Sequence, residues 1–392
     1  MNLKQKHRLR QGLLIGGIIL IAFNLRPGLA AVGPLISAIR LDTGLSNALL
    51  GFLTTLPLLA FGVVSMFTSL FTRKWGIETT LAGALVLLTA GTLLRVFPIT
   101  AALFGGTLLI GIGIAFGNVL LPSLIKRDFP DKKGIMTSLY SGVLGVGATI
   151  GAGISIPLAE PLGWRWSLGA WALPAFIGLL LWLPQLKFQT RPKHTRTFSE
   201  SIKKLGNSRL AWQVALFMGL QSLAFYVVLA WLPEILQSRG MEPAQAGWML
   251  SLSQGTGVLG SLLIPTWAEK FKRQHAIIWG LTVMEFISLV GLIIPSAPFV
   301  AIWVSLIGFT LGGSFGLALL FIVLRTTDTE TATELSGLAQ SIGYLLAAAG
   351  PALFGLLYDL SHNWKIPLLM LFGVLLAKLF FGLGASRPRA IN

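Results

Sequence analysis

Residues 12–38 read GLLIGGIILIAFNLRPGLAAVGPLISA, an apolar run that Asn24, Arg26 and Pro27 interrupt near its middle. A helix needs about 20 mostly apolar residues to cross a hydrocarbon layer of about 30 Å, and this run is longer than that. An arginine near mid-membrane is costly in lipid, so its side chain should face protein, water or a ligand. The stretch therefore predicts a membrane span that carries a charged and potentially functional residue.

Apolar runs of this length recur along the chain, separated by short polar turns. We expect twelve spans, near 11–38, 47–71, 79–97, 100–124, 136–159, 166–185, 210–236, 245–267, 276–294, 299–324, 335–357 and 365–385. The expected fold class is an all-α polytopic membrane protein with 12 transmembrane helices.

Composition agrees with lipid as the main solvent of the chain. Of 392 residues, 54% are hydrophobic and 11% are charged, against about 25% charged residues in soluble domains. The chain has no cysteine, which excludes disulfides, thiolate metal sites and a cysteine nucleophile. The net charge of +16 comes from basic clusters between apolar runs, a pattern typical of cytoplasmic loops and not of a nucleic-acid-binding face.

The distribution of Lys and Arg predicts the orientation. Basic residues before the first apolar run resemble a signal peptide, but the helical pattern continues to about Ala38, so we expect an uncleaved first helix. With the N-terminus inside, the outer loops hold only five basic residues, which are Arg40, Arg95, Arg165, Arg239 and Lys365. Because positive charge marks cytoplasmic loops, both termini and the central loop are expected in the cytoplasm.

The longest polar segment falls at the midpoint and divides six spans from six. We expect an N-terminal six-helix bundle over 1–185, a cytoplasmic loop over 186–209 and a C-terminal six-helix bundle over 210–392. A weak internal repeat supports this division, since Gly163-Trp164-Arg165 and Asn363-Trp364-Lys365 occupy corresponding places. Paired halves of this kind are typical of transporters whose site lies where the halves meet.

Several stretches resemble the cyanate and nitroimidazole transporter family of the major facilitator superfamily, over nearly the whole chain. They are 24–27 (NLRP), 53–57 (LTTLP), 117–130 (GNVLLPSLIKRDFP), 231–233 (WLP) and 339–351 (AQSIGYLLAAAGP). The resemblance is closer to the 2-nitroimidazole exporter branch. It implies two pseudo-symmetric bundles, a bacterial inner-membrane location, a monomer, no cofactor, and a small solute that has acceptor oxygens or anionic character.

The function that the resemblance implies is secondary active transport by alternating access, with export of 2-nitroimidazole-like compounds. Uptake or exchange of a small anion such as cyanate, or broader drug efflux, stays open as an alternative. One motif departs from the superfamily pattern, because the acidic residue expected before Arg73-Lys74 in the loop after the second span is missing. That acid usually latches the cytoplasmic gate.

Arg26 is the leading candidate for substrate binding. Its guanidinium presents a planar fork of donors that suits two acceptor atoms, such as the oxygens of a nitro group or the ends of cyanate. The alternative is an arginine neutralised by helix carbonyls or by a buried acid. Asn24 is a further candidate, although its position two residues away favours a helix–helix hydrogen bond, and Pro27 should kink the helix.

Glu285 is the carboxylate that the pattern places deep inside a span, which makes it a candidate for proton coupling. In the resembled fold the ninth helix is peripheral, so a structural role is an equal alternative.

Neutral polar and aromatic side chains within the spans could line a site for a flat ligand. These further substrate-binding candidates are Asn118, Tyr140, Gln221, Tyr226, Gln254, Gln340 and Tyr344. Gln340 and Tyr344 share a helix face because they are four residues apart. Hydrogen bonding between helices is the alternative for each of them.

The sequence lacks the residues that an enzyme or a channel would need. The four histidines fall in loops or at the N-terminus, and no carboxylate pair or metal-ligand cluster shares one depth, so we expect neither an enzyme nor a metal site. A channel would need a ring of repeated polar groups or a filter motif, which the sequence does not contain.

Overall fold

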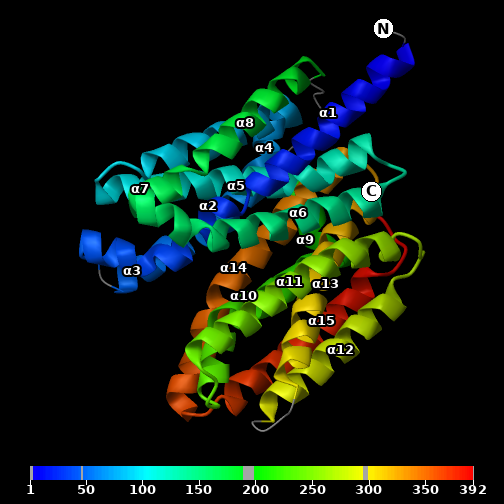
Figure 1. The fold of residues 1–392 in the computed structure, drawn as a ribbon. Coiled ribbons are helices and arrows are strands. Elements are labelled where there is room, and N and C mark those ends of the chain that lie inside the picture. Colours follow the sequence, from blue (N-terminus) through cyan, green and yellow to red (C-terminus); the bar gives the residue numbers. More distant parts are fainter. Residues whose placement is uncertain (1–2, 46, 189–197, 295–298, 392) are drawn as a thin grey trace. The chain divides into compact units, whose positions relative to one another are not determined.

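The computed structural model describes residues 3–45, 47–188, 198–294 and 299–391. These residues form helices and their connections without a β-strand, and 88% of the chain is helical, which confirms the all-α fold class. The helices are α1 (Leu3–Asn24), α2 (Pro27–Ala30), α3 (Val32–Thr43), α4 (Asn47–Leu94), α5 (Thr100–Asp128), α6 (Lys133–Gly153), α7 (Ser155–Gly169), α8 (Ala172–Trp182), the short 3₁₀ helix Leu183–Phe188, α9 (Phe198–Asn207), α10 (Arg209–Gln237), α11 (Pro243–Ala268), α12 (His275–Ile293), α13 (Val300–Leu324), α14 (Thr329–Ser361) and α15 (Lys365–Ala385) (Figure 1).

Nine of the described helices are long and apolar enough to cross a membrane, or ten if the bent pair Ser155–Gly169 and Ala172–Phe188 counts as one span. The run Leu49–Leu94 covers two of the predicted spans. It breaks at Gly76, whose φ of 80° lies in the left-handed region that glycine adopts without steric cost. The first predicted span is likewise divided into α1, α2 and α3.

The chain forms two compact units. The N unit comprises Met1–Leu124 and Val143–Phe198, and the C unit comprises Ile125–Gly142 and Ser199–Asn392. The domain boundaries expected from the sequence, with one bundle on either side of residues 186–209, remain a prediction.

The segment Ile125–Gly142 belongs to the C unit because polar contacts tie it there. The Lys126 Nζ donates to the carbonyl oxygens of Val323, at 2.9 Å, and Thr326. The Gly134 backbone N–H donates to the Glu269 carboxylate at 2.6 Å. These bonds attach the C-terminal end of α5 and the start of α6 to α11 and to the end of α13.

Helix α9 lies inside the segment expected to be a polar loop. Ser201 and Leu205, four residues apart, are buried, whereas Lys203 is exposed. One buried face on an otherwise polar helix is an amphipathic pattern, which the high charge of the segment obscured.

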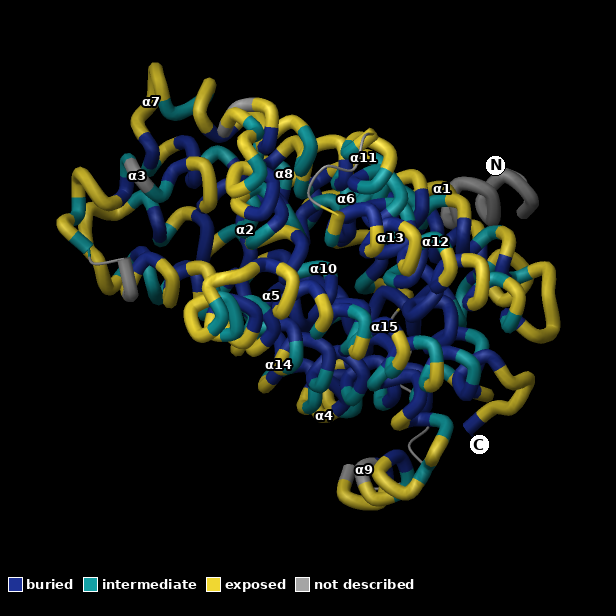
Figure 2. The backbone as a smooth tube through the Cα atoms, turned by 90° about the horizontal axis from the view of Figure 1, so that it is seen from below, coloured by how far each residue is buried: buried dark blue, intermediate teal, exposed yellow. Residues whose placement is uncertain are grey.

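In the C unit, α13 is buried along most of its length, whereas α15 exposes many apolar side chains (Figure 2). Small residues allow α11 and α13 to pack closely, since a methyl group at Gly312 would collide with the backbone of Gly257. Exposed apolar side chains such as Leu376 and Phe380 on α15 are what a lipid-facing helix requires.

Candidate functional site

Arg26 lies at a break in the first membrane span. Helix α1 ends at Asn24, Arg26 has φ −122° and ψ −40°, and α2 begins at Pro27. Proline has no N–H and its ring clashes with the carbonyl four residues back, which kinks or breaks a helix, and before position 27 the helix breaks. The expected kink is confirmed, and it falls at the residue expected to bind the substrate.

Glycines of α6 pack directly against the backbone of this break. A methyl group at Gly147 would lie 2.6 Å from the Phe23 carbonyl oxygen, and one at Gly151 would lie 2.6 Å from the Pro27 Cα. Both distances are too short for a side chain, so only glycine permits this approach. Gly147 and Gly151 therefore have a packing role in the N unit.

Two more helices of the N unit hold the residues around the break. The Asn24 Nδ2 donates to the Leu20 carbonyl at 2.8 Å and to the Pro174 carbonyl at 3.0 Å. Leu25, next to Arg26, is fully buried and packs against Gly117 of α5. The backbone that carries Arg26 is therefore fixed on several sides, while the Arg26 side chain itself remains partly exposed.

Arg95, at the end of α4, completes the surroundings of the break. Its Nη1 donates to the Gly28 carbonyl at 2.8 Å, two residues beyond Arg26. The side chain is fully buried, and its Nε and Nη2 have no hydrogen-bond partner among the described residues. The sequence did contain a signal, since Arg95 falls at the end of an apolar run, but a position near a predicted outer loop suggested an exposed residue.

Among the neutral candidates, Asn118 is next in sequence to a residue that contacts the break. It is buried and adjoins Gly117, which packs on Leu25. Tyr140 is also buried, but it belongs to the C unit. In the N unit, Asn24 and Arg26 thus lie at the break, and Asn118 follows the glycine that packs on Leu25.

The remaining candidates lie on three helices of the C unit, α10, α11 and α14. Gln221 of α10 is buried, donates to the Leu311 carbonyl at 3.1 Å and accepts a hydrogen bond from Ser222 at 3.1 Å. Both ends of this amide are therefore used between or within helices. Gln340 and Tyr344 are buried on α14, Tyr226 is partly exposed beside Phe225 on α10, and Gln254 is partly exposed on α11.

Glu285 forms an ion pair that the sequence pattern did not reveal. Its carboxylate contacts the Nζ of Lys378 on α15, and each side chain is only 3% exposed. Removing one member of such a buried pair leaves an uncompensated charge, so each side chain depends on the other where α12 packs against α15.

Charged groups at the junction of α13 and α14 also have internal partners. Burial lowers the pKa of Arg325 to about 10, and its Nε donates to the Ala385 carbonyl at 2.7 Å. Burial alone would raise the pKa of Asp328, but hydrogen bonds from Thr331 and Thr327 reverse this effect and lower it below its ordinary value. Asp328 accepts from the Thr331 backbone N–H at 2.8 Å and so caps the start of α14.

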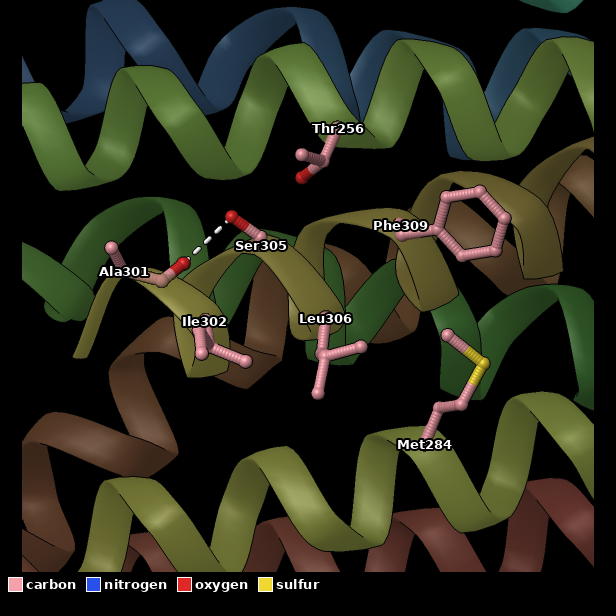
Figure 3. Close-up of a pocket in the computed structure, with 7 residues that line it drawn as sticks. All are labelled: Thr256, Met284, Ala301, Ile302, Ser305, Leu306 and Phe309. Atoms are coloured by element: carbon pink, nitrogen blue, oxygen red, sulfur yellow. Dashed lines mark hydrogen bonds between the residues drawn. The ribbon is translucent and has the colours of Figure 1, made fainter. Parts of the chain in front are cut away.

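A pocket of about 460 Å³ opens beside α11, α12 and α13 in the C unit (Figure 3). It is lined by Thr256, Met284, Ala301, Ile302, Ser305, Leu306 and Phe309. Its hydroxyl groups bond within their own helices, Ser305 to Ala301 at 2.6 Å and Thr256 to Ser253 at 3.0 Å. Because no expected site residue lines this apolar pocket, we do not assign the substrate to it. Within the described ranges, no group of three or more His, Asp or Glu side chains could hold a metal ion.

Long apolar helices and a first span that breaks at an arginine are features of polytopic membrane transporters. The model of the Major Facilitator Superfamily matches residues 18–351 and 214–390, and the chain belongs to this family. Among curated proteins, the 2-nitroimidazole transporter of Escherichia coli (strain K12) is 41% identical over 100% of this chain and 99% of its own length.

The cyanate transport protein CynX of the same organism is 29% identical over 93% of this chain and 96% of its own. The fold is also that of a solved transporter, FucP in its outward conformation, with a TM-score of 0.76 and 13% identity over 95% of this chain and 99% of that one. The protein is thus a transporter of small solutes and not an enzyme, in the branch that includes the nitroimidazole and cyanate transporters.

Proposed function

We propose that this protein is a secondary active transporter that exports 2-nitroimidazole-like compounds by alternating access, with Arg26 as the residue that binds the nitro group. The observation that carries the proposal is the position of Arg26 at a helix break whose backbone is fixed by α5, α6, α8 and Arg95. A guanidinium on a rigid backbone loses little entropy when it binds two oxygens, so its fork suits a nitro group.

The comparison with relatives supports 2-nitroimidazole over cyanate as the cargo. The chain is 41% identical to the 2-nitroimidazole transporter and 29% identical to the cyanate transport protein. Cyanate remains the second candidate because Arg26 would also bind a small anion. Asn24, Asn118, Tyr140, Gln221, Tyr226, Gln254, Gln340 and Tyr344 are proposed as lining residues, with Asn118 first because it adjoins the contacts around the break.

Transport in proteoliposomes tests this function. Vesicles loaded with unlabelled 2-nitroimidazole should accumulate labelled compound by exchange, whereas protein-free vesicles should not. In cells, expression should lower the internal level of the compound, and a rise would show uptake and contradict export. Exchange of cyanate without exchange of 2-nitroimidazole would favour the second candidate.

We also propose that both termini face the cytoplasm of a bacterial inner membrane. A reporter that is active only in the periplasm should be silent when fused after residue 195, which lies outside the described residues, and active after residue 240. The reverse pattern would contradict this orientation.

A further inference from the structure

Arg95 carries a charge that the described part of the protein does not balance. Its side chain is fully buried, and its single hydrogen bond goes to the Gly28 carbonyl. The Nε and Nη2 have no acceptor, although a guanidinium has five N–H groups to satisfy. Buried charges in proteins are normally paired, since an isolated ion loses several kcal/mol of hydration.

The neighbours of the Arg95 side chain that can be identified are neutral. A Cβ at Gly28 would lie 3.8 Å from the Arg95 Nη2, and one at Gly106 would lie 2.7 Å from the Arg95 Cγ. Ile110 fills the remaining side, since its side chain also lies 3.6 Å from that Gly28 Cβ position. None of these neighbours from α2 and α5 carries a titratable group, and the described residues form no ion pair with Arg95.

Two arginines therefore stand at one helix break. Arg26 begins the turn whose Gly28 carbonyl accepts the Arg95 hydrogen bond. Asp42, a carboxylate of the same unit, pairs instead with Arg165 at an exposed position. The Arg95 charge has no counter-ion among the described residues, and its attraction for an anion is strengthened by the low dielectric around it.

We propose that the cargo is bound as a monoanion, so that a 2-nitroimidazole is carried in its deprotonated form, the 2-nitroimidazolate. This inference rests on the proposed function. The nitro group withdraws electrons from the ring and makes the ring N–H acidic, so the proton passes to water before binding. Arg26 would contact the anion, and Arg95 would act as a positioning residue that fixes the break and adds a second positive charge.

The first experiment varies the charge of the ligand. The dissociation constant of the purified protein for 2-nitroimidazole is measured by calorimetry at several pH values on both sides of the ligand's own pKa. If only the anion binds, the apparent constant should rise about tenfold per pH unit below that pKa and stay level above it, because affinity scales with the competent fraction. The analogue 1-methyl-2-nitroimidazole cannot ionise, so its affinity should not change with pH and should be at least about tenfold weaker than that of 2-nitroimidazole above that pKa.

Equal affinity for the methylated analogue, or a constant affinity across the ligand's pKa, would overturn the inference. A titrating protein group would give a transition at its own pKa, whichever ligand is used. Repeating the series with 4-nitroimidazole, whose pKa differs, should move the transition with the ligand.

The second experiment assigns the selectivity to Arg95. Arg95→Gln keeps a donor for the Gly28 carbonyl but removes the charge, and the ratio of affinities for anion and methylated analogue should fall about tenfold. Arg95→Lys keeps the charge and should retain the preference for the anion, which a purely structural role of the guanidinium would not predict. Arg165→Gln, which also removes a charge from the N unit, is the matched control and should leave the ratio unchanged.

Failure of the proposed function gives a different result. If 2-nitroimidazole and its methylated analogue both fail to bind at every pH, the assigned cargo is wrong. The charge preference is then tested with 4-hydroxybenzoate against 4-hydroxybenzamide and with cyanate. Binding of the anions alone supports the inference with a different cargo, whereas binding of the amide alone, or of none of these probes, contradicts it.

Discussion

Each unit of the protein contains a fully buried cation within its helices, and the two are treated differently. Lys378 in the C unit contacts Glu285, whereas Arg95 in the N unit has only the Gly28 carbonyl. Both residues are at most 3% exposed to solvent. Burial therefore does not separate them, but charge balance does.

The difference teaches where to look for function. In a buried ion pair each charge is compensated by the other, so the pair between α12 and α15 needs no ligand as a counter-ion. A buried guanidinium with unused donors is complete only when something else brings an acceptor or a negative charge. Arg26 stands beside the second kind of cation and Glu285 is part of the first, which is why we assign substrate binding to Arg26 and a structural role to Glu285.

The largest expected effect comes from breaking the pair in the C unit. Lys378→Met leaves Glu285 buried without a counter-ion and should lower the free energy of unfolding by about 3–5 kcal/mol. The double variant Lys378→Met/Glu285→Leu should recover most of this loss and should still transport. Thermal unfolding in detergent and exchange in proteoliposomes measure the two properties. If the double variant were stable but had lost only pH-gradient-driven transport, Glu285 would be the proton carrier after all.

The second prediction concerns Arg26, where the guanidinium fork is expected to matter more than the charge. Arg26→Lys should fold but lose a charge-assisted hydrogen bond, which costs about 1.5–3 kcal/mol of binding, or roughly a tenfold to hundredfold weaker affinity. Arg26→Ala should bind still more weakly without lowering the stability of the ligand-free protein. Wild-type affinity in Arg26→Lys, together with a destabilised Arg26→Ala, would make Arg26 structural, like Lys378.

The third prediction tests whether the rigid break is needed. In Gly147→Ala the new methyl group would meet the Phe23 carbonyl at 2.6 Å, so the backbone must shift at a cost of about 1–3 kcal/mol. Ligand affinity should fall because Arg26 moves with this backbone. Gly16→Ala is the matched control, since a methyl there meets nothing within 4 Å and alanine favours the helix by about 0.5–1 kcal/mol. Unchanged affinity in Gly147→Ala would show that the break tolerates movement.

The smallest expected effect lies at Asp328, which caps α14 in the C unit. Asp328→Ala should cost about 1 kcal/mol of stability and leave affinity unchanged. The folded-state pKa of this carboxyl lies below its ordinary value, so its contribution is present above the unfolded pKa and is lost as pH falls through the folded one. The difference between wild type and Asp328→Ala should therefore be constant at neutral pH and shrink below about pH 4. An effect on affinity would mean that the ends of the C unit take part in binding.

The sequence was a good guide to features that depend on one segment alone. Long apolar runs predicted the membrane fold, and Pro27 predicted the kink, because each follows from local composition or a missing N–H. Helix α9 was not predicted because its few buried positions lie among charged residues. The predicted spans also do not correspond one to one with the observed helices. Two of them fall in the single helix α4, because the backbone remains helical on both sides of Gly76.

The site was harder to predict because its key facts are contacts between distant segments. Arg26 could be selected from its place in an apolar run. The partner of Glu285 lies 93 residues away and that of Gly28 lies 67 residues away, and no spacing rule connects them. Whether a buried charge is balanced depends on such pairs. The sequence alone could therefore name Glu285 and Arg26 as candidates, but it could not show that Glu285 has an ion-pair partner.

The buried charge of Arg95, which no described residue pairs, also has an electrical consequence. If a monoanion fills the site, the loaded and empty forms of the carrier differ by one elementary charge. Each export cycle then moves one negative charge outward, which an inside-negative membrane potential favours by about 2.3 kcal/mol per 100 mV. Transport would be electrogenic, and the voltage across the membrane alone could drive it without a dedicated proton pathway.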